Sequence, residues 1–516
     1  MTEANLAKPA TRQKNPAKPS RSSINPAKPV NIGDQQPEQT GPAMGPRIYN
    51  LFPRVLGPID TWADKHLERI KKMGFDWIYL NPLSYPGFSG SLYAIKDYYK
   101  FNPMFAPAGA TDPYSWEPLE AFIKICHAKG LKVMYDLVIN HTSIDSPLVE
   151  EHRNWYVIKS VVIRKSDGKV VFQCPLDQPA SKRHFSEKSY TIEERVAHPC
   201  AIDPSDSRKV TIWGDLAEID HENSPDKANM LAYWLDLVSF YIDKGMDGFR
   251  CDAAYQVPAD TWKKIIQMAR AHKKDTLFAA ETLGCTLDQI KETVQAGFDY
   301  IYNSSKYWDF TQPWCPEQYE SFRKAAPSIS FPESHDTKRL ADETNKREDV
   351  QKFRYLFAAF FSAGVMMPVG YEFGFTRPLD VVNGSPADWQ APNFDISEFI
   401  GKVNAFKQRF RCLNEDGPMK HFDYGNKAVL VLRKTSMDEK QHLLLVYNKN
   451  WNNPQEVILD SVPYFLDLGT PVHFVSPVGE NKVLDGTSWR ATLEPNGYVF
   501  MLQEQSTQEL NARGLK

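Results

Sequence analysis

From residue 47 to about residue 410, short apolar runs alternate with longer stretches whose apolar residues recur at helical spacing. This alternation is typical of βα units, in which each strand joins a parallel sheet and each helix covers it. The runs expected as strands are 47–52, 75–81, 131–140, 246–252, 276–281, 298–303, 328–333 and 364–370. The stretches expected as helices are 61–73, 116–129, 227–244, 258–271, 287–296, 316–325, 347–362 and 396–410. Eight strands with eight helices predict an α/β fold of the (β/α)8 TIM-barrel type, expected over residues 46–417.

Two segments interrupt or precede this pattern. Residues 1–45 are rich in Pro and Lys and repeat a short Pro/Lys phrase every ten residues, which predicts a disordered arm. Residues 142–214 follow the third expected strand and are too many for a simple loop, so we expect an inserted subdomain there.

A third segment follows the barrel. Short alternating strands are expected at 428–433, 442–447, 456–459, 472–475, 489–493 and 499–502. They predict a C-terminal antiparallel β-sandwich over residues 418–503, with a loose tail at 504–516.

Charge and cysteine usage narrow the partners and the compartment. The chain has 61 Lys+Arg against 64 Asp+Glu, a net charge of −3, which gives no reason to expect nucleic acid or an anionic membrane as partner. Its seven cysteines are odd in number and lack metal-binding spacing, so we expect reduced thiols in a cytoplasmic protein. We find neither the apolar core of a secretory signal nor a run of about 18 apolar residues, so we expect no membrane partner.

Polar residues gather where the expected strands end. In a (β/α)8 barrel these ends form the catalytic face. The residues expected there are three carboxylates, two histidines and one arginine, namely Asp252, Glu281, Asp336, His141, His335 and Arg250. Cleaving a glycosidic bond with retention needs a carboxylate nucleophile and a carboxylic acid about 5–5.5 Å apart. Arg250 lies two residues before Asp252, so both side chains face the same way and the cation is expected to keep Asp252 ionised.

With these motifs the sequence resembles glycoside hydrolase family 13, the α-amylase family. The resemblance rests on four short regions, 136–141, 248–252, Glu281 with its strand, and His335 with Asp336. It implies Asp252 as nucleophile, Glu281 as general acid/base and Asp336 as the third carboxylate. It also implies Arg250, His141 and His335 as substrate and charge-positioning residues, Tyr93 as an aromatic platform, Asp97 as a structural or glucose-contacting acid, and the insert as the family's domain B.

Two departures bear on specificity and on metal binding. Tyr255 and Gln256 stand where many amylases have Lys-His in contact with substrate. We expect Tyr255 to bind substrate there, but endo-acting amylase specificity is not implied. Asn140 and Asp215 match common calcium ligands, but Gln256 replaces the histidine that supplies a carbonyl. We therefore expect no required cofactor and keep calcium as an open alternative.

Some phrases resemble the maltosyltransferases that elongate α-glucan from maltose 1-phosphate, at residues 151–155, 213–220 and 370–372. The leading hypothesis is a retaining α-glucoside hydrolase acting on α-1,4-glucans or maltooligosaccharides. The alternatives are a transglycosylase or maltosyltransferase with the same residues, and a non-catalytic glucan-binding protein. The sequence leaves the acceptor and the oligomeric state open.

Overall fold

The computed structural model describes residues 44–178, 180, 184–203, 206–307, 314–467, 471–479 and 481–505. The expected N-terminal arm lies outside the described residues except for its last two positions. The expected C-terminal tail is described only at Glu504 and Gln505. Along the described chain, no helix is both long enough and apolar enough to cross a membrane.

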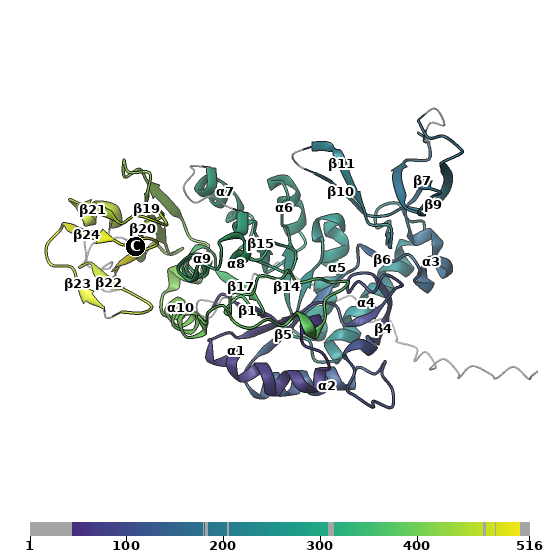
Figure 1. Cartoon of the computed structure of the whole chain (residues 1–516), viewed down its shortest axis with the longest axis horizontal. Coiled ribbons are helices and arrows are strands. Elements are labelled where there is room, and N and C mark those ends of the chain that lie inside the picture. Colours follow the sequence, from purple (N-terminus) through teal and green to yellow (C-terminus); the bar gives the residue numbers. More distant parts are fainter. Residues whose placement is uncertain are drawn as a thin grey trace, which may run out of the picture. The chain divides into compact units, whose positions relative to one another are not determined.

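Parallel strands close into a barrel in the order β1-β17-β16-β15-β14-β13-β5-β2 (Figure 1). The strands are β1 Arg47–Asn50, β2 Trp77–Leu80, β5 Lys132–Leu137, β13 Gly248–Cys251, β14 Leu277–Glu281, β15 Tyr300–Tyr302, β16 Ser328–Ser330 and β17 Gly364–Pro368. Each lies inside a segment expected as a strand, so the predicted TIM-barrel fold class is confirmed. Since all the strands run the same way, their carboxyl ends open on one face.

Helices cover the outside of the barrel (Figure 1). They are α1 Glu68–Lys72, α2 Glu117–Ala128, α4 Lys227–Asp243, α5 Ala259–His272, α6 Leu287–Val294, α7 Trp314–Phe322, α8 Leu340–Glu343, α9 Glu348–Phe361 and α10 Ser397–Arg409. The first expected helix is wrong as a single element. It divides into a 3-10 turn at Ile59–Thr61, a π-helical turn at Ala63–Leu67 and α1. The π turn lies where buried His66 packs against the ring of Trp389, with centroids 5.3 Å apart.

The barrel strands separate two apolar layers. One fills the interior with residues such as Trp77, Met134 and Tyr302. The other, much larger, lies between strands and helices. Cys251 belongs to this outer layer and is fully buried, as expected of a residue that alternates with Arg250 along the strand. Arg250 therefore points inward while Cys251 packs against the helices.

The long connection after β5 forms small sheets of its own. It contains β6 His141–Ser143, α3 Pro147–Glu151, β7 Ile158–Arg164, β8 Val170–Cys174, β9 Tyr190–Val196, β10 Cys200–Asp203, β11 Asp206–Ile212 and β12 Leu216–Glu218. β6 pairs with β12 antiparallel, which brings the start and the end of the excursion together. The expected insert therefore has strand structure, and His141 lies in the ladder at its base.

After the barrel, two antiparallel sheets pack around a separate apolar core. Their elements are β18 Met419–Phe422, β19 Val429–Thr435, β20 Gln441–Asn448, β21 Gln455–Leu459, α11 Val462–Leu466, β22 His473–Val475, β23 Lys482–Val483, β24 Trp489–Leu493 and β25 Tyr498–Glu504. The sheets run β18-β19-β20-β25-β22-β23 and β21-β24, and the core draws residues from both. Lys434 of β19 donates to the carbonyls of Phe360 and Phe361, both at 2.9 Å. This ammonium caps the end of α9 and joins the β-sandwich to the barrel.

Candidate active site

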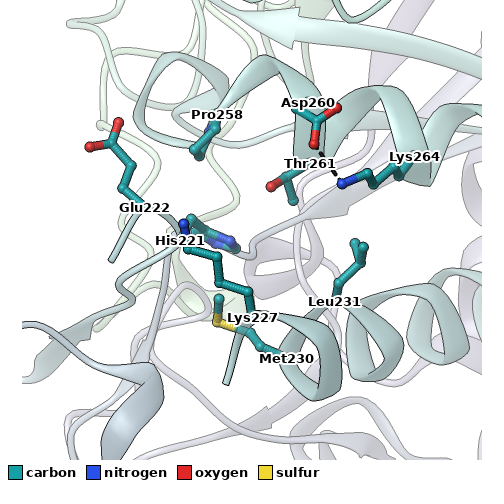
Figure 2. A pocket seen from close by; sticks show the side chains of 9 residues that line it. All are labelled: His221, Glu222, Lys227, Met230, Leu231, Pro258, Asp260, Thr261 and Lys264. Carbon is teal, nitrogen blue, oxygen red and sulfur yellow. Dashed lines mark ion pairs between the residues drawn. The ribbon is translucent and has the colours of Figure 1, made fainter. Parts of the chain in front are cut away.

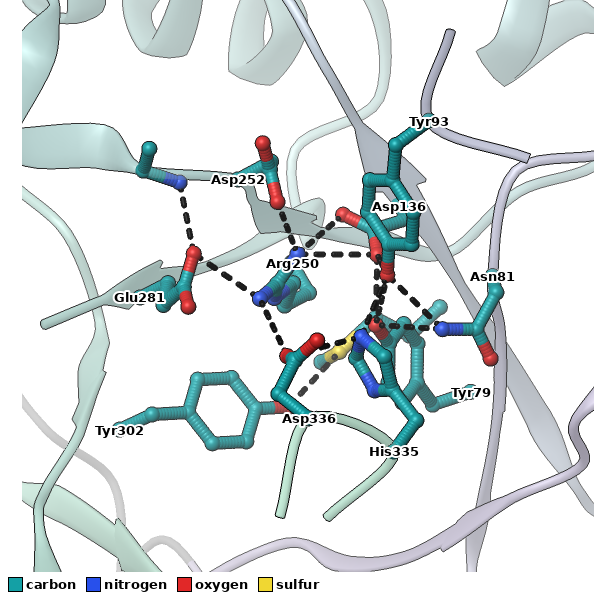
Figure 3. Close-up of polar contacts among 12 residues, drawn as sticks. Tyr79, Asn81, Tyr93, Asp136, Arg250, Asp252, Glu281, Tyr302, His335 and Asp336 are labelled. Atoms are coloured by element: carbon teal, nitrogen blue, oxygen red, sulfur yellow. Dashed lines mark hydrogen bonds and ion pairs between the residues drawn. The ribbon is translucent and has the colours of Figure 1, made fainter. Parts of the chain in front are cut away.

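Figure 3 shows carboxylates from neighbouring strands meeting around one guanidinium. In the barrel register Arg250 of β13 lies opposite Asp136 of β5 and Ala279 of β14. Asp252 follows β13 directly, and Glu281 is the last residue of β14. Asp252 and Glu281 are therefore together because adjacent parallel strands end at the same level, and Asp336 joins them from the loop after β16.

Arg250 is the centre of this cluster. Its Nη1 lies 2.6 Å from Asp252 Oδ1 and 2.9 Å from Asp136 Oδ1. Its Nη2 lies 2.9 Å from Glu281 Oε2 and 4.0 Å from Asp336 Oδ2. Burial alone would lower the pKa of Arg250, but the carboxylates, Asp136 first, raise it. The guanidinium is thus a fixed cation that orients the acids around it.

Asp252 and Glu281, the expected nucleophile and general acid/base, influence each other's ionisation. Burial raises the pKa of Asp252 well above its ordinary value, and Glu281 adds to the rise. Arg250 opposes this rise but does not cancel it, so the expectation that the cation alone keeps Asp252 ionised is wrong. Burial likewise raises the pKa of Glu281. Arg250 lowers this pKa, and Asp336 raises it further. Since four carboxylates face one guanidinium, the pair favours holding a proton, and its titration belongs to both groups. One protonated and one ionised carboxyl is the state that retaining glycoside chemistry needs.

The residue after Asp252 ties the two acids together. Ala253 adopts a left-handed conformation with φ 39° and ψ 47°, which is uncommon for a residue with a Cβ. Its N–H donates to Glu281 Oε2 at 2.7 Å. Such backbone strain is concentrated at functional sites, and here it turns the chain so that an amide holds the second acid.

Asp336 has a different electrostatic environment. Its Oδ2 lies 3.0 Å from His335 Nε2. Burial would raise its pKa, but His335 and Arg250 outweigh this and lower it to about 2. Its side chain is 46% exposed, against 13% for Asp252 and 19% for Glu281. Asp336 is therefore an ionised carboxylate at the mouth of the cluster, within reach of a ligand from solvent.

Tyr93 and His335 form one wall. Their rings are stacked, with centroids 5.6 Å apart and an angle of 8° between planes, and His335 Nε2 lies 2.7 Å from the Tyr93 hydroxyl. Tyr93 lies in the loop between β3 (Ser84–Pro86) and β4 (Ile95–Phe101). Its hydroxyl donates to Asp136 Oδ2 at 2.6 Å and accepts from Asn81 Nδ2 at 2.8 Å. These contacts hold the ring beside the acids, where it can cover the apolar face of a sugar.

Asp136, Tyr79, Asn81 and Tyr302 join the cluster although sequence reasoning did not select them as site residues. The Tyr79 hydroxyl donates to Asp136 Oδ2 at 2.6 Å, and Asp136 is almost completely buried. A signal was present in the sequence, because Tyr79 and Asn81 alternate at the end of the second strand and Asp136 lies in the third.

Among the described residues, His141 and Asp97 make no hydrogen bond or ion pair with Asp252, Glu281 or Asp336. His141 Nε2 donates to the carbonyl of Tyr93 at 3.1 Å, and burial lowers its pKa to about 4, so the ring is neutral at pH 7. It supports the loop that carries the Tyr93 wall. The Asp97 carboxylate lies 2.9 Å from Lys100 Nζ and accepts from the N–H of Tyr99. These contacts of Asp97 are local to β4 and reach none of the three expected catalytic acids.

Tyr255 lies on the rim of the cluster. Its side chain is 36% exposed, and burial together with Glu281 raises its pKa to about 12. Tyr307, which sequence reasoning did not select, is 61% exposed and interacts electrostatically with Glu343 and Asp336. Exposed aromatic rings therefore border the acids from the loops after β13 and β15.

The expected calcium ligands, Asn140 and Asp215, offer few oxygen atoms to a metal ion. Asn140 Nδ2 donates to Gln256 Oε1 at 3.1 Å, while the buried Oδ1 of Asn140 has no partner among the described residues. The carbonyl of Asp215 accepts from the N–H of Ile144. Within the described residues no three His, Cys, Asp or Glu side chains gather as metal ligands. The free oxygen of Asn140 suits a cation, but a calcium ion takes six to eight oxygens, and these residues do not supply them.

Sequence and structure comparisons show which known proteins this chain is similar to. Residues 42–156 match the family described as glycogen debranching enzyme, glucanotransferase domain. The alpha-1,4-glucan:maltose-1-phosphate maltosyltransferase of Burkholderia pseudomallei is 22% identical over 432 residues, which are 81% of this chain and 34% of that protein. The intracellular maltogenic amylase of Bacillus subtilis is 23% identical over 414 residues, 77% of this chain and 62% of that protein.

Among solved structures, the alpha-amylase of Geobacillus thermoleovorans complexed with acarbose superposes with a TM-score of 0.66. It is 18% identical and covers 89% of this chain and 99% of that one, a likeness that shows the fold. The chain spans between one third and two thirds of the length of the two curated relatives named above. The resemblance to glycoside hydrolase family 13, with its maltosyltransferase-like side, is confirmed.

Proposed function

We propose that this chain, with its α-amylase-like barrel and strand-end acids, is a retaining α-glucoside hydrolase acting on α-1,4-glucans or maltooligosaccharides. The observation that carries the proposal is the joint binding of Asp252 and Glu281 by Arg250, at 2.6 and 2.9 Å, on the carboxyl ends of adjacent strands. A pair that holds one proton supplies both an acid and a nucleophile.

In the proposed first step, Glu281 donates its proton to the glycosidic oxygen while Asp252 attacks the anomeric carbon. The bond to the leaving sugar breaks, that sugar departs as an alcohol, and a glycosyl ester forms on Asp252. The ionised Asp336 and the Tyr93 ring would hold the sugar and favour its distortion. Arg250 remains in place throughout as the cation that orients Asp252.

In the second step, Glu281 removes a proton from an incoming hydroxyl, whose oxygen attacks the anomeric carbon and displaces Asp252. Water as acceptor gives hydrolysis, and a sugar hydroxyl gives transfer. The exposed ring of Tyr255, close enough to interact electrostatically with both acids, favours binding a sugar acceptor. Transglycosylation, including maltosyl transfer from maltose 1-phosphate, is therefore the second candidate.

Two further expectations accompany this proposal. We propose that no metal takes part in the reaction, and that any calcium would bind near Asn140 as a structural ion. We also keep the cytoplasm as the proposed compartment, because the sequence contains cysteines without a disulfide pattern.

The experiment is chromatography of products from maltopentaose at increasing concentration, with and without inorganic phosphate and maltose 1-phosphate. We expect shorter sugars at every concentration, joined at high concentration by products longer than maltopentaose, because a positioned sugar can compete with water. Glu281→Gln should suppress both product classes together, since one residue serves both acceptors.

The outcomes separate the alternatives. Shorter products alone at every concentration would rule out transfer. Turnover that begins only when maltose 1-phosphate is added would identify maltosyl transfer as the function. Binding of maltopentaose without any products would leave the non-catalytic glucan-binding protein.

A further inference from the structure

A cleft of about 270 Å³ lies between the first turns of α4 and α5, and none of the acid-cluster residues lines it. Figure 2 shows its lining drawn from the chain that leaves β12 and from the starts of both helices. A smaller cavity of about 20 Å³ borders part of the acid cluster and is lined by Arg250, Glu281 and Asp336 among others. Pockets for drug-sized ligands measure about 300–1,000 Å³, so the larger cleft suits one small ring.

His221 supplies a hydrogen-bond acceptor in this cleft. Only 6% of the residue is exposed, and its Nε2 lies 2.7 Å from the carbonyl of Ile139. A carbonyl can only accept, so Nε2 carries the hydrogen and Nδ1 keeps a lone pair while the ring is neutral. Nδ1 has no hydrogen-bond partner in the described part of the chain, and burial lowers the pKa of His221. The cleft therefore contains a neutral acceptor, carried by a largely buried side chain, that is available to a hydroxyl.

The remaining polar groups are of mixed type. Lys227 and Glu222 line the cleft, and neither has an ion-pair partner among the described residues. Lys264 pairs with Asp260 at 2.5 Å on the opposite side, as Figure 2 shows. Since the charges of the lining balance, it favours neither an anion nor a cation. The hydroxyl of Thr261 adds a group that can both donate and accept.

Apolar side chains complete the lining. Leu231 and Met230 of α4 lie on one side and Pro258 on the other. A lining with separate donors, separate acceptors and aliphatic surface is complementary to a ring that carries hydroxyls and C–H faces. Neither inorganic phosphate nor an apolar molecule would satisfy all of these groups.

We propose that this cleft is an accessory sugar site that binds one glucosyl unit of an α-glucan. The site is distinct from the acid cluster, and only the identity of the sugar as glucose rests on the proposed function. The lining of the cleft is connected to two loops of the catalytic face, the loop after β5 and the loop after β13. His221 is anchored on Ile139, and the next residue, Asn140, holds the side chain of Gln256, two residues before Pro258.

The test is equilibrium dialysis of labelled maltotriose against the full-length chain carrying Glu281→Gln, which prevents turnover. We expect two molecules bound per chain. Leu231→Trp should fill the cleft and reduce this to one, and Lys227→Ala should weaken the second site at least about tenfold, the effect of roughly 1.4 kcal/mol. Lys263→Ala is the matched control, because this exposed lysine of α5 does not line the cleft.

One bound molecule in the starting protein, unchanged by Leu231→Trp and by Lys227→Ala, would overturn the accessory site. Displacement of the second maltotriose by inorganic phosphate would overturn its assignment as a neutral-sugar site. Turnover of maltopentaose by the unmodified chain reports the proposed function separately. Turnover together with a single binding site would contradict only the accessory site. Two binding sites without turnover would contradict only the proposed enzymatic function.

Discussion

Ionisation of Asp252 destabilises the folded protein, because four carboxylates, Asp252 included, surround the single cation of Arg250. The raised pKa of Asp252 means that the folded chain binds this proton more tightly than the unfolded chain. The resulting stability is present below the ordinary pKa of an aspartate and is lost as the pH rises through the folded value. Asp252→Asn removes the ionisation and leaves Arg250 paired with Asp136 and Glu281.

We therefore predict that Asp252→Asn lowers kcat by about 10³-fold or more. We also predict that it raises Tm at pH 7 by about 1–3 °C. The rise should vanish near pH 3.5, where the wild-type carboxyl is already protonated. Product assays and calorimetry at the two pH values check this. More than a tenth of the wild-type kcat, or a lower Tm at pH 7, would contradict the assigned role and electrostatics.

The loop after β16 carries His335 and Asp336, and a buried ion pair holds it. Arg339 Nε lies 3.2 Å from Glu333 Oε1, and both side chains are almost fully buried. Glu333 Oε2 also accepts from the N–H of Leu340, and Arg339 donates to the carbonyl of Val369. These contacts fix both ends of the segment that presents the third carboxylate.

At this scale we predict that Arg339→Met costs about 3–5 kcal/mol in the free energy of unfolding, because it leaves Glu333 as an unpaired buried charge. It should also reduce kcat through loss of the loop geometry. Urea unfolding and kinetics measure the two effects. Adding Glu333→Gln should recover part of the stability, and the exposed Lys338→Met is the control on the same loop. Full stability in Arg339→Met would show that the pair does not hold the loop.

At the scale of the whole molecule, barrel and β-sandwich are joined by buried contacts, and the N-terminal arm is not expected to add to them. Residues 1–40 carry few apolar side chains to bury. We predict that deleting them leaves Tm and specific activity unchanged. Thermal melting and maltopentaose turnover of the shortened chain check this, and a fall in Tm of more than a few degrees would show that the arm docks on the barrel.

The sequence by itself determined the barrel, because strand and helix periodicity are local signals and eight repeats leave few topologies. It also located Asp252, Glu281 and Asp336, since each follows or ends a strand whose carboxyl end must face the site. Only the tertiary structure decided which groups surround Arg250. The contact with Asp136 depends on the register between strands that are 114 residues apart in the chain.

Tertiary structure also decided the positions of side chains carried by loops. Tyr93 reaches His335 from a loop 242 residues away in the chain, whereas Asp97, four residues later, contacts its own strand. The cleft at His221 likewise forms where two helix starts, separated in sequence, come together. Local patterns specify which elements form and which face they bury. The distances between side chains on different elements follow from packing, which no local pattern encodes.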